Sequence, residues 1–570
     1  MKINTKVALL ALLPLASVNS PFMAALGQGN VTSASTNTAT TKDAEKSKPD
    51  GVASKFFETE SQTNEGSVTI GGNRLDYQAV AGTLVVHPKG WDDVPPKPDT
   101  AAKPGQDKDQ ADKGADSDQN PSAEASMFYA AYFKAGATAE TRPITFLFNG
   151  GPGSSTVWLH MGAFGPKRVL TADDTHSPAA PYKLVSNEES LLDASDLVFI
   201  DAPGAGFSRI AGKDKEKAFW GMDADAYAFT EFITEFLSRY GRWNSPKYLF
   251  GESYGTMRSA ILVNELETER DIDFNGVILL SQILNFDLKL GASEINPGID
   301  LPYQLALPTY AATAWYHHLL PGDQRDLPSL VKSAEQFAMN DYALALQAGA
   351  SLSPEQIEAI AAKLHEFTGL SVAYIKKANL RIDGGEFEKN LQDEHDITTG
   401  RLDTRFSGPT MDPLSKEADY DPQSAAISSA YVSAFNAYVR QELKFGQNKT
   451  YRPEVEVWKT WNFQHQPPNA SFPLPTSFQA PNVMPDLASA MKYNPNLRIQ
   501  LHAGYFDLAT PFWEGQYEMG HLQIPASLQT NIEYCLYQSG HMVYAHEASL
   551  KELHDNVAAF IRKTDNLEPK

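Results

Sequence analysis

Short apolar runs recur between residues 144 and 280 and again between 497 and 537. A polar loop and a helical pattern follow most of them. One long amphipathic stretch of helical period spans 218–240. Strands that are apolar throughout are typical of a sheet buried on both faces, and their alternation with helices predicts a mostly parallel sheet with helices on both sides. The expected fold class is therefore α/β. The strands expected in this sheet are 144–148, 197–200, 248–250, 277–280, 497–502 and 532–537.

A different pattern precedes this sheet. Residues 67–70 and 75–80 alternate in polarity around two glycines, which predicts a β-hairpin. A further strand is expected at 127–133. Residues 88–125 are dominated by Pro, Lys, Asp, Gln, Ala and Gly. This composition predicts a disordered surface insertion between two paired strands, and not a domain boundary.

The strand pattern largely disappears between about residues 295 and 445. The helical periods there indicate a cap inserted into the sheet domain. The predicted organisation is a first part of the core at 63–294, a helical cap insertion at 295–480 and a last part of the core at 481–570. The helices expected in the cap are 308–320, 327–348, 354–370 and 425–445, and a terminal helix is expected at 545–562.

The N-terminal segment predicts export. Lys2 and Lys6 precede the apolar run 7–16, and small residues follow, which is the pattern of a secretory signal peptide over 1–27. The alternative is a disordered tail with a chance apolar patch. The run is too short to span a bilayer, and no later stretch qualifies as a transmembrane helix. We therefore expect a periplasmic or extracellular protein with a flexible linker at 28–62.

Composition narrows the possible partners. The chain has 570 residues, a formal net charge of -22 and a sequence pI of about 5.0. This acidic balance argues against nucleic acid and against an anionic membrane surface. The single cysteine, Cys535, excludes an intrachain disulfide and a cysteine-based metal site. Its apolar neighbours favour a buried structural thiol over a reactive one.

The strongest chemical signal is the pentapeptide Gly-Glu-Ser-Tyr-Gly at 251–255. It follows the strand 248–250 and precedes an apolar period typical of a helix at 256–270. A sharp turn between strand and helix, with glycines on both sides, exposes a serine hydroxyl at the edge of the sheet. Short Gly/Ser patterns also occur by chance, but this context favours Ser253 as a nucleophile.

A serine nucleophile needs a base, and the base needs an orienting carboxylate. In this architecture the order along the chain is Ser, acid, His, each after a strand. Asp507 follows the strand 497–502, and His541 follows the strand 532–537 in a Gly-flanked loop. The other histidines are expected on the surface or in the core. Asp201 also ends a strand, but it precedes Ser253 and is expected to support its own loop.

The negative charge that forms during acyl transfer needs amide donors. One is the N–H of Tyr254, the residue after the nucleophile, and the other should come from an earlier Gly-rich loop. The candidate loop is 149–153, Asn-Gly-Gly-Pro-Gly. A simple turn or a phosphate cradle is the alternative, but the loop lacks the G-x-G-x-x-G spacing and the lysine of a P-loop.

Four motifs together resemble the serine carboxypeptidase family. They are Asn-Gly-Gly-Pro-Gly-Ser-Ser at 149–155, Asp-Ala-Pro at 201–203 with Gly-Phe-Ser at 206–208, the pentapeptide at 251–255, and Gly-His-Met-Val at 540–543. The resemblance implies an α/β-hydrolase fold with a helical insertion. It also implies an enzyme that removes C-terminal residues from peptides or proteins, usually best at acid pH, without a metal or a cofactor.

The resemblance also implies a role for each matching residue. Ser253 corresponds to the nucleophile, His541 to the base and Asp507 to the acid. Gly151 and Tyr254 correspond to the oxyanion donors. Two further matches, Asn149 and Glu252, correspond to the residues that bind the terminal carboxylate of the substrate. Glu252 has to be protonated to do so, which gives a physical reason for an acid preference.

Several positions depart from the family pattern. A second glutamate usually stands where this chain has Ala163, so half of the expected carboxylate clamp is missing. Leu147 replaces a tryptophan, Tyr505 replaces an aspartate, and the family disulfides cannot form. An esterase or acyltransferase on the same triad therefore stays an alternative, as does a non-catalytic binding protein with this fold.

Overall fold

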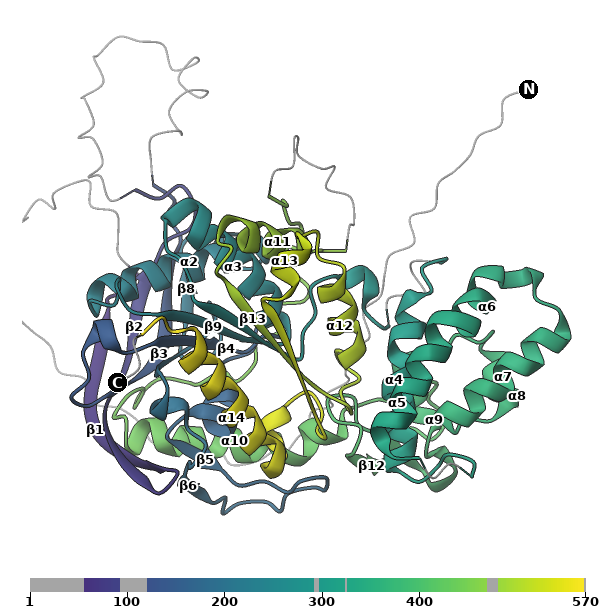
Figure 1. The fold of residues 1–570 in the computed structure, drawn as a ribbon. Coiled ribbons are helices and arrows are strands. Elements are labelled where there is room, and N and C mark those ends of the chain that lie inside the picture. Colours follow the sequence, from purple (N-terminus) through teal and green to yellow (C-terminus); the bar gives the residue numbers. More distant parts are fainter. Residues whose placement is uncertain (1–55, 93–119, 292–296, 323–324, 469–479, 568–570) are drawn as a thin grey trace, which may run out of the picture. The chain divides into compact units, whose positions relative to one another are not determined.

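The apolar runs form the centre of a ten-stranded sheet (Figure 1). The computed structural model describes residues 56–92, 120–291, 297–322, 325–468 and 480–567. The strands of the large sheet are β1 (Glu60–Ile70), β2 (Asn73–Val86), β3 (Glu124–Lys134), β4 (Ile144–Phe148), β7 (Asp196–Ile200), β8 (Arg209–Ala211), β9 (Lys247–Glu252), β10 (Gly276–Leu280), β13 (Arg498–Gly504) and β14 (Ile532–Tyr537). Two separate hairpins are β5 (Lys167–Val169) with β6 (Leu184–Ser186), and β11 (Ile397–Thr399) with β12 (Ser407–Pro409).

The strand order is β1-β2-β3-β7-β4-β9-β10-β13-β14, with β8 paired to β3. All pairs from β7 to β14 are parallel, and the first three strands and the β3–β7 pair are antiparallel. The expected α/β class and mostly parallel sheet are confirmed. In register, Glu252 lies opposite Leu280, and Leu280 opposite His502. The loops after β9, β10, β13 and β14 therefore meet at one edge of the sheet.

The helices complete the layers. They are α1 (Lys215–Phe219), α2 (Met222–Arg239), α3 (Tyr254–Arg270), α4 (Leu301–Tyr316), α5 (Leu327–Phe337), α6 (Ala343–Ala348), α7 (Pro354–Thr368), α8 (Val372–Lys377), α9 (Gly384–Asn390), α10 (Pro422–Gln441), α11 (Met484–Tyr493), α12 (Phe512–Gly520), α13 (Ala526–Gln529) and α14 (Glu547–Thr564). Figure 1 shows α2, α3 and α11 on one face of the sheet and α10 and α14 on the other.

Both faces of the sheet are buried, as the apolar strands predict. In β10, Val277 and Leu279 belong to the hydrophobic core on the side of α2 and α3. Ile278 and Leu280 belong to the core that includes α10 and α14. Successive side chains of a strand point to opposite faces, so a strand covered on both sides needs an apolar residue at every position.

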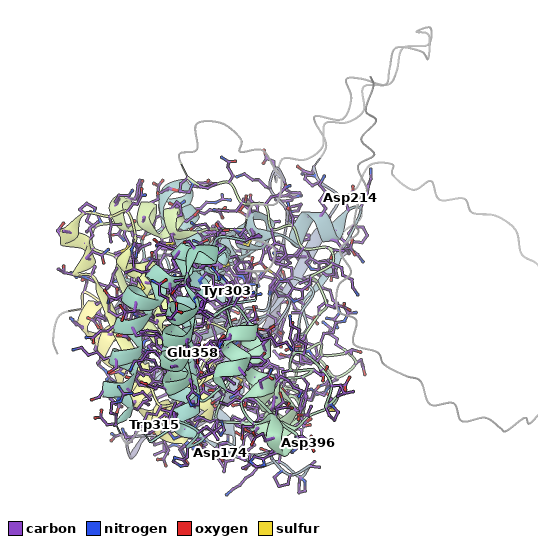
Figure 2. All side chains as sticks on the ribbon, turned by 90° about the vertical axis from the view of Figure 1, so that its right-hand side faces the viewer. Asp174, Asp214, Tyr303, Trp315, Glu358 and Asp396 are labelled. Atoms are coloured by element: carbon purple, nitrogen blue, oxygen red, sulfur yellow. The ribbon has the colours of Figure 1, made fainter. Side chains whose placement is uncertain are left out.

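The helices between β10 and β13 are of two kinds. Those from α4 to α9 share a hydrophobic core of their own, in which the rings of Tyr310 and Phe387 stack 4.1 Å apart. By contrast, Tyr431 and Phe435 place α10 in the sheet core beside α14. Figure 2 faces the first group and labels Trp315 on α4 and Glu358 on α7. The predicted cap range 295–480 thus contains a helix, α10, that covers the sheet itself.

Several expected boundaries differ from the structure. Strand β1 begins at Glu60, inside the predicted linker 28–62. Helix α4 begins at Leu301 with Pro302 in its first turn and runs through Pro308, which was expected to start it. The stretch 218–240 is two helices, because the chain is extended at Gly221. A proline or glycine marks a boundary only statistically, and tertiary packing decides which one breaks the helix.

The hairpin of 67–70 and 75–80 is confirmed by the β1–β2 pairing. The strands flanking the expected insertion 88–125 are paired as well, although residues 93–119 of that insertion lie outside the described residues. The predicted signal peptide 1–27 and most of the linker also lie outside them and stay predictions. Within the described ranges, no helix combines the length and apolar character that crossing a bilayer needs.

Candidate active site

Ser253 is the single residue between the end of β9 and the start of α3. Its backbone has φ 60° and ψ -129°, a conformation that is strained for any residue but glycine. A Cβ on Gly251 would lie 2.3 Å from the carbonyl oxygen of Gly255, so the turn requires glycine there. Ser253 is partly exposed while both of its neighbours are buried. This is the strained elbow that the pentapeptide predicts.

Asp507 and His541 are in direct contact. The Nδ1 of His541 lies 2.8 Å from Oδ2 of Asp507, and both residues are buried. The other carboxylate oxygen accepts the N–H groups of Ala509 and Thr510 at 2.9 and 3.0 Å, and the Thr510 hydroxyl donates to Oδ2 at 2.8 Å. These bonds fix the carboxylate, so the imidazole is oriented with Nε2 left for another partner.

The end of β10 links the elbow to the histidine loop. The N–H of Ser253 donates to the carbonyl oxygen of Leu280 at 3.0 Å. The next residue, Ser281, donates its hydroxyl to the carbonyl oxygen of His541 at 2.7 Å. In the described residues no hydrogen bond joins the side chains of Ser253 and His541. Such a bond often forms only when substrate closes the site.

The Gly-rich loop lies against the elbow. A Cβ on Gly150 would lie 2.4 Å from the backbone nitrogen of Tyr254, so only glycine permits this approach. Arg258 of α3 donates to the carbonyl oxygen of Asn149 at 2.8 Å and is fully buried beside Asp225, 2.6 Å away. The structure thus brings the loop of Gly151 to the start of α3, where the first N–H groups of the helix have no intrahelical acceptor.

Asn149 and Glu252 also come together, and a tyrosine joins them. The hydroxyl of Tyr544 lies 3.1 and 2.9 Å from the two carboxyl oxygens of Glu252. The side chain of Asn149 lies close enough to Glu252 to lower its pKa, and its Oδ1 accepts the N–H of Leu159 at 3.1 Å. The sequence predicted that Asn149 and Glu252 act together as a carboxylate clamp, which stays a prediction, and it did not indicate Tyr544. Its position directly after the motif at 540–543 was the available signal.

Tyr544 packs beside the turn that contains Ala163, the position at which the family pattern has a glutamate. Ala163 stands at that position, in a buried π-helical turn (Leu159–Phe164). A Cβ on the neighbouring Gly162 would lie 2.7 Å from the rings of both Tyr431 and Tyr544. The glycine at 162 therefore leaves the room that the two tyrosine rings fill.

The site perturbs two pKa values. Burial raises the pKa of Glu252 to about 7, against smaller opposing effects of His541, Tyr544 and Asn149. Burial alone would lower the pKa of His541, but its attraction and hydrogen bond to Asp507 outweigh burial and hold it above its usual value. The charge of Glu252 adds to this rise. The two groups interact electrostatically, so their titrations are linked.

A loop of the inserted region is hydrogen-bonded to the loops that carry Asp507 and His541, and no sequence motif indicated it. The N–H of Thr404 donates to Phe506 O at 2.9 Å, and the N–H of Leu508 donates to Arg401 O at 3.1 Å, so the loop brackets Asp507. The N–H of His541 donates to Leu402 O at 2.6 Å.

The side chain of Asp403 belongs to the same loop. It accepts the N–H of Gly540 at 3.2 Å while paired with the buried Arg405 at 2.7 Å. The loop 401–405 therefore fixes the chain on both sides of Asp507 and directly before His541.

The other residues singled out in the sequence, Asp201 and Cys535, contact the surrounding protein fold. Asp201 accepts the N–H groups of Thr156 and Phe207 at 2.8 and 3.3 Å, which confirms its expected role in supporting its loop. Cys535 is half-buried in β14, and burial raises the pKa of its thiol. No cluster of three or more His, Cys, Asp or Glu side chains suited to a metal ion occurs in the described part of the chain.

Comparison with known proteins gives the family of this chain. The model of a family described as serine carboxypeptidase matches residues 117–551, which is more than half of the chain. The pheromone-processing carboxypeptidase KEX1 of Phytophthora infestans (strain T30-4) is 30% identical over 141 residues. That match covers 22% of this chain and 21% of KEX1, so it spans about a fifth of the relative.

Two solved structures illustrate the more distant likenesses. The proline iminopeptidase of Mycobacterium smegmatis is 13% identical with a TM-score of 0.31, covering 77% of this chain and 96% of that one. The monoacylglycerol lipase of Paleococcus ferrophilus is 12% identical with a TM-score of 0.28, covering 74% and 94%. At these values neither structure indicates what this chain binds or cleaves.

Proposed function

This chain belongs to the serine carboxypeptidase family, and we propose that it removes C-terminal residues from peptides through an acyl-enzyme. The observation that carries the proposal is the buried Glu252 beside Ser253, held by Asn149 and Tyr544. A Ser-His-Asp arrangement alone supports any acyl hydrolase. A protonated carboxyl group next to the nucleophile can, in addition, donate a hydrogen bond to a free substrate carboxylate.

In the proposed mechanism, Ser253 Oγ attacks the scissile carbonyl carbon while Nε2 of His541 takes the hydroxyl proton. Asp507 stabilises the imidazolium that forms. The negative charge on the carbonyl oxygen is met by the N–H groups of Gly151 and Tyr254. The C–N bond then breaks, and the departing amine takes its proton from His541. Water, deprotonated by the same imidazole, attacks the ester on Ser253 and releases the shortened peptide.

The proposed clamp gives the reaction a distinctive pH dependence. Glu252 is protonated below its pKa of about 7 and can then donate to the terminal carboxylate. Above that pH it is charged and repels the substrate. His541 must be neutral to act as a base, so activity also falls toward acid pH. The expected profile for a free acid is a bell, with His541 governing the acid limb and Glu252 the alkaline limb.

The test compares one blocked dipeptide as its free acid, its C-terminal amide and its ester, between about pH 5 and 9, a range that brackets both groups. For the free acid, KM should rise about tenfold per pH unit above the Glu252 pKa. The amide and the ester should lack this alkaline limb, and Glu252→Gln should remove it from the free acid. Ser253→Ala should abolish turnover of all three and labelling by a fluorophosphonate.

Equal turnover of free acid and amide at every pH would contradict the carboxypeptidase proposal and favour an esterase or acyltransferase on the same residues. Failure of a fluorophosphonate to label the parent protein would favour a binding protein. We also propose export to a periplasm or the cell exterior, on the pattern of residues 1–27. Sequencing the N-terminus of the mature protein tests this, and a mature chain that retains these residues contradicts it.

A further inference from the structure

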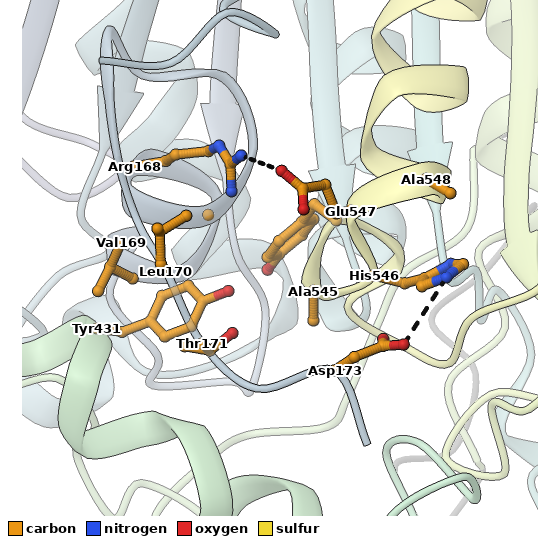
Figure 3. A pocket seen from close by; sticks show the side chains of 12 residues that line it. Arg168, Val169, Leu170, Thr171, Asp173, Tyr431, Ala545, His546, Glu547 and Ala548 are labelled. Atoms are coloured by element: carbon orange, nitrogen blue, oxygen red, sulfur yellow. Dashed lines mark hydrogen bonds and ion pairs between the residues drawn. The ribbon is translucent and has the colours of Figure 1, made fainter. Parts of the chain in front are cut away.

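A cavity lies beside the proposed carboxylate clamp. It has a volume of about 220 Å³ and opens between the strand β5, the helix α10 and the N-terminus of α14 (Figure 3). A single water needs only about 15 Å³ of such space, so a side chain fits here. Arg168, Thr171, Tyr431 and His546 are among the residues around it.

The side chain of Tyr544 contacts both this cavity and Glu252. The ring of Tyr544 lines the cavity, while its hydroxyl contacts the Glu252 carboxyl at 2.9 Å. Gly162 lines the cavity too, and it keeps the rings of Tyr431 and Tyr544 close together. The carboxylate and the side chain of an amino acid leave the same Cα. A C-terminal residue whose carboxylate lies on Glu252 therefore has its side chain within a few bonds of this wall.

The cavity offers hydrogen-bond donors that are not fully used. The Tyr431 residue is 1% exposed, its hydroxyl points into the cavity in Figure 3, and it has no hydrogen-bond partner among the described residues. Burial raises its pKa, so the hydroxyl stays a donor. Thr171 presents a second hydroxyl. Glu547 and Ala548 line the cavity at the start of the 18-residue helix α14, whose first N–H groups carry partial positive charge.

Arg168 is a positively charged side chain of the cavity lining and can bind an anion there. The side chain of Arg168 is 18% exposed, and its partner Glu547, at 2.7 Å, is 81% exposed. An exposed partner is bound weakly and can swing into solvent. The acidic residue Asp173 is paired with the buried Arg405 at 3.0 Å and lies 3.9 Å from His546. Arg405 is shared between Asp173 and Asp403, so an anion in the cavity depends on Arg168 turning from the exposed Glu547 to the new carboxylate.

We propose that this cavity binds the side chain of the substrate's C-terminal residue and favours an acidic one, aspartate or glutamate. Arg168 and the hydroxyl of Tyr431 would receive the side-chain carboxylate. This proposal rests on the proposed carboxypeptidase function, because it assumes that the terminal carboxylate binds at Glu252.

The experiment measures kcat/KM for blocked dipeptides that differ only in a C-terminal Glu, Gln or Leu. The parent protein should prefer Glu to Gln. Arg168→Gln should lower the Glu/Gln ratio about tenfold, the usual cost of a hydrogen bond to a charged group, and leave Leu nearly unchanged. Arg168→Lys should keep most of the preference. Tyr431→Phe should lower the ratio about threefold by the loss of one hydrogen bond.

Two further variants sharpen the test. Glu547→Gln releases Arg168 from its partner and should raise the Glu/Gln ratio. Lys167→Gln removes a charge from the neighbouring position of β5, which does not line the cavity, and should leave the ratio unchanged. An unchanged ratio in Arg168→Gln overturns the inference, as does an equal loss for all three substrates. Failure of the parent to cleave any free-acid dipeptide would instead contradict the proposed function.

Discussion

The two halves of the candidate site are built in different ways. The predicted triad stands on loops that directly follow β9, β13 and β14, at one edge of a parallel sheet. The clamp collects Asn149, Glu252 and Tyr544, and Tyr544 is 292 positions from Glu252 in sequence. The sheet determines where the triad lies. The clamp depends on side-chain packing among small residues and aromatic rings.

This difference is reflected in how closely each half of the site matches the family sequence pattern. The three predicted triad positions keep the residue types of the family pattern, while the predicted clamp departs from it at Ala163 and contains Tyr544 as a further contact of Glu252. Tyr544 gives Glu252 a hydrogen-bond donor that does not titrate near neutral pH, since burial raises the pKa of Tyr544 well above its usual value. Glu252 is then the clamp residue that titrates near neutral pH. Variants of each half should therefore fail in distinguishable ways.

The largest effect is expected in the triad. Asp507→Asn should lower kcat roughly 10⁴-fold, because an amide favours the wrong imidazole tautomer. The loss should be equal for free acid, amide and ester, and KM should change little. Thr510→Val, which removes one hydroxyl bonded to the same carboxylate, is the control and should lose about tenfold or less. A Thr510 variant as poor as the Asp507 variant would contradict this assignment.

An intermediate effect is expected where the loop 401–405 meets the triad. A Cβ on Gly540 would lie 2.5 Å from Asp403 Cβ and from Leu402 O, so one loop must shift. Gly540→Ala should lower kcat about 100-fold, the usual cost of displacing a catalytic group by about 1 Å. KM should change less.

Gly520→Ala is the matched control for this prediction. No atom lies within 4 Å of the added Cβ at the end of α12, so activity should be normal. Normal kcat in the Gly540 variant would show that the loop 401–405 does not position His541. Thermal unfolding of both variants separates a local shift from a loss of folding.

The smallest effect is expected in the clamp. Tyr544→Phe removes one hydroxyl from Glu252 and keeps the ring. KM for the free acid should rise about five- to tenfold, which corresponds to one hydrogen bond. The amide and the ester should be unaffected, and kcat should stay close to that of the parent. An equal change for all three substrates would assign Tyr544 to the packing of the histidine loop and not to the clamp.

Much of the fold was predictable because its signals are local. The expected strands 144–148 and 532–537 coincide with β4 and β14, and the alternation with helices indicated the parallel sheet. The pentapeptide located Ser253 for the same reason, since a strained turn needs its glycines within a few residues. Helix boundaries at Pro308 and Gly221 were less predictable, because packing competes with local propensity there.

The candidate site was predictable only where a motif spans it. Asp507 and His541 follow strands in an expected order, and the structure brings them into contact at 2.8 Å. Asp403 lies in a loop with no motif, and its bond to Gly540 joins residues 137 positions apart. Nothing in the local composition of either segment indicates that pairing.

By itself, the sequence of this protein determined the order of the central strands, the apolar character of the sheet and the residue types that follow three strands at their carboxyl ends, Ser253, Asp507 and His541. Hydrophobic period and turn chemistry act over a few residues, so they can be inferred from neighbours along the chain. Only the tertiary structure decided that Tyr544 joins Glu252, that the loop 401–405 braces the triad and that a cavity opens beside the clamp. These contacts depend on which distant surfaces pack together, and close packing leaves their partners no local trace.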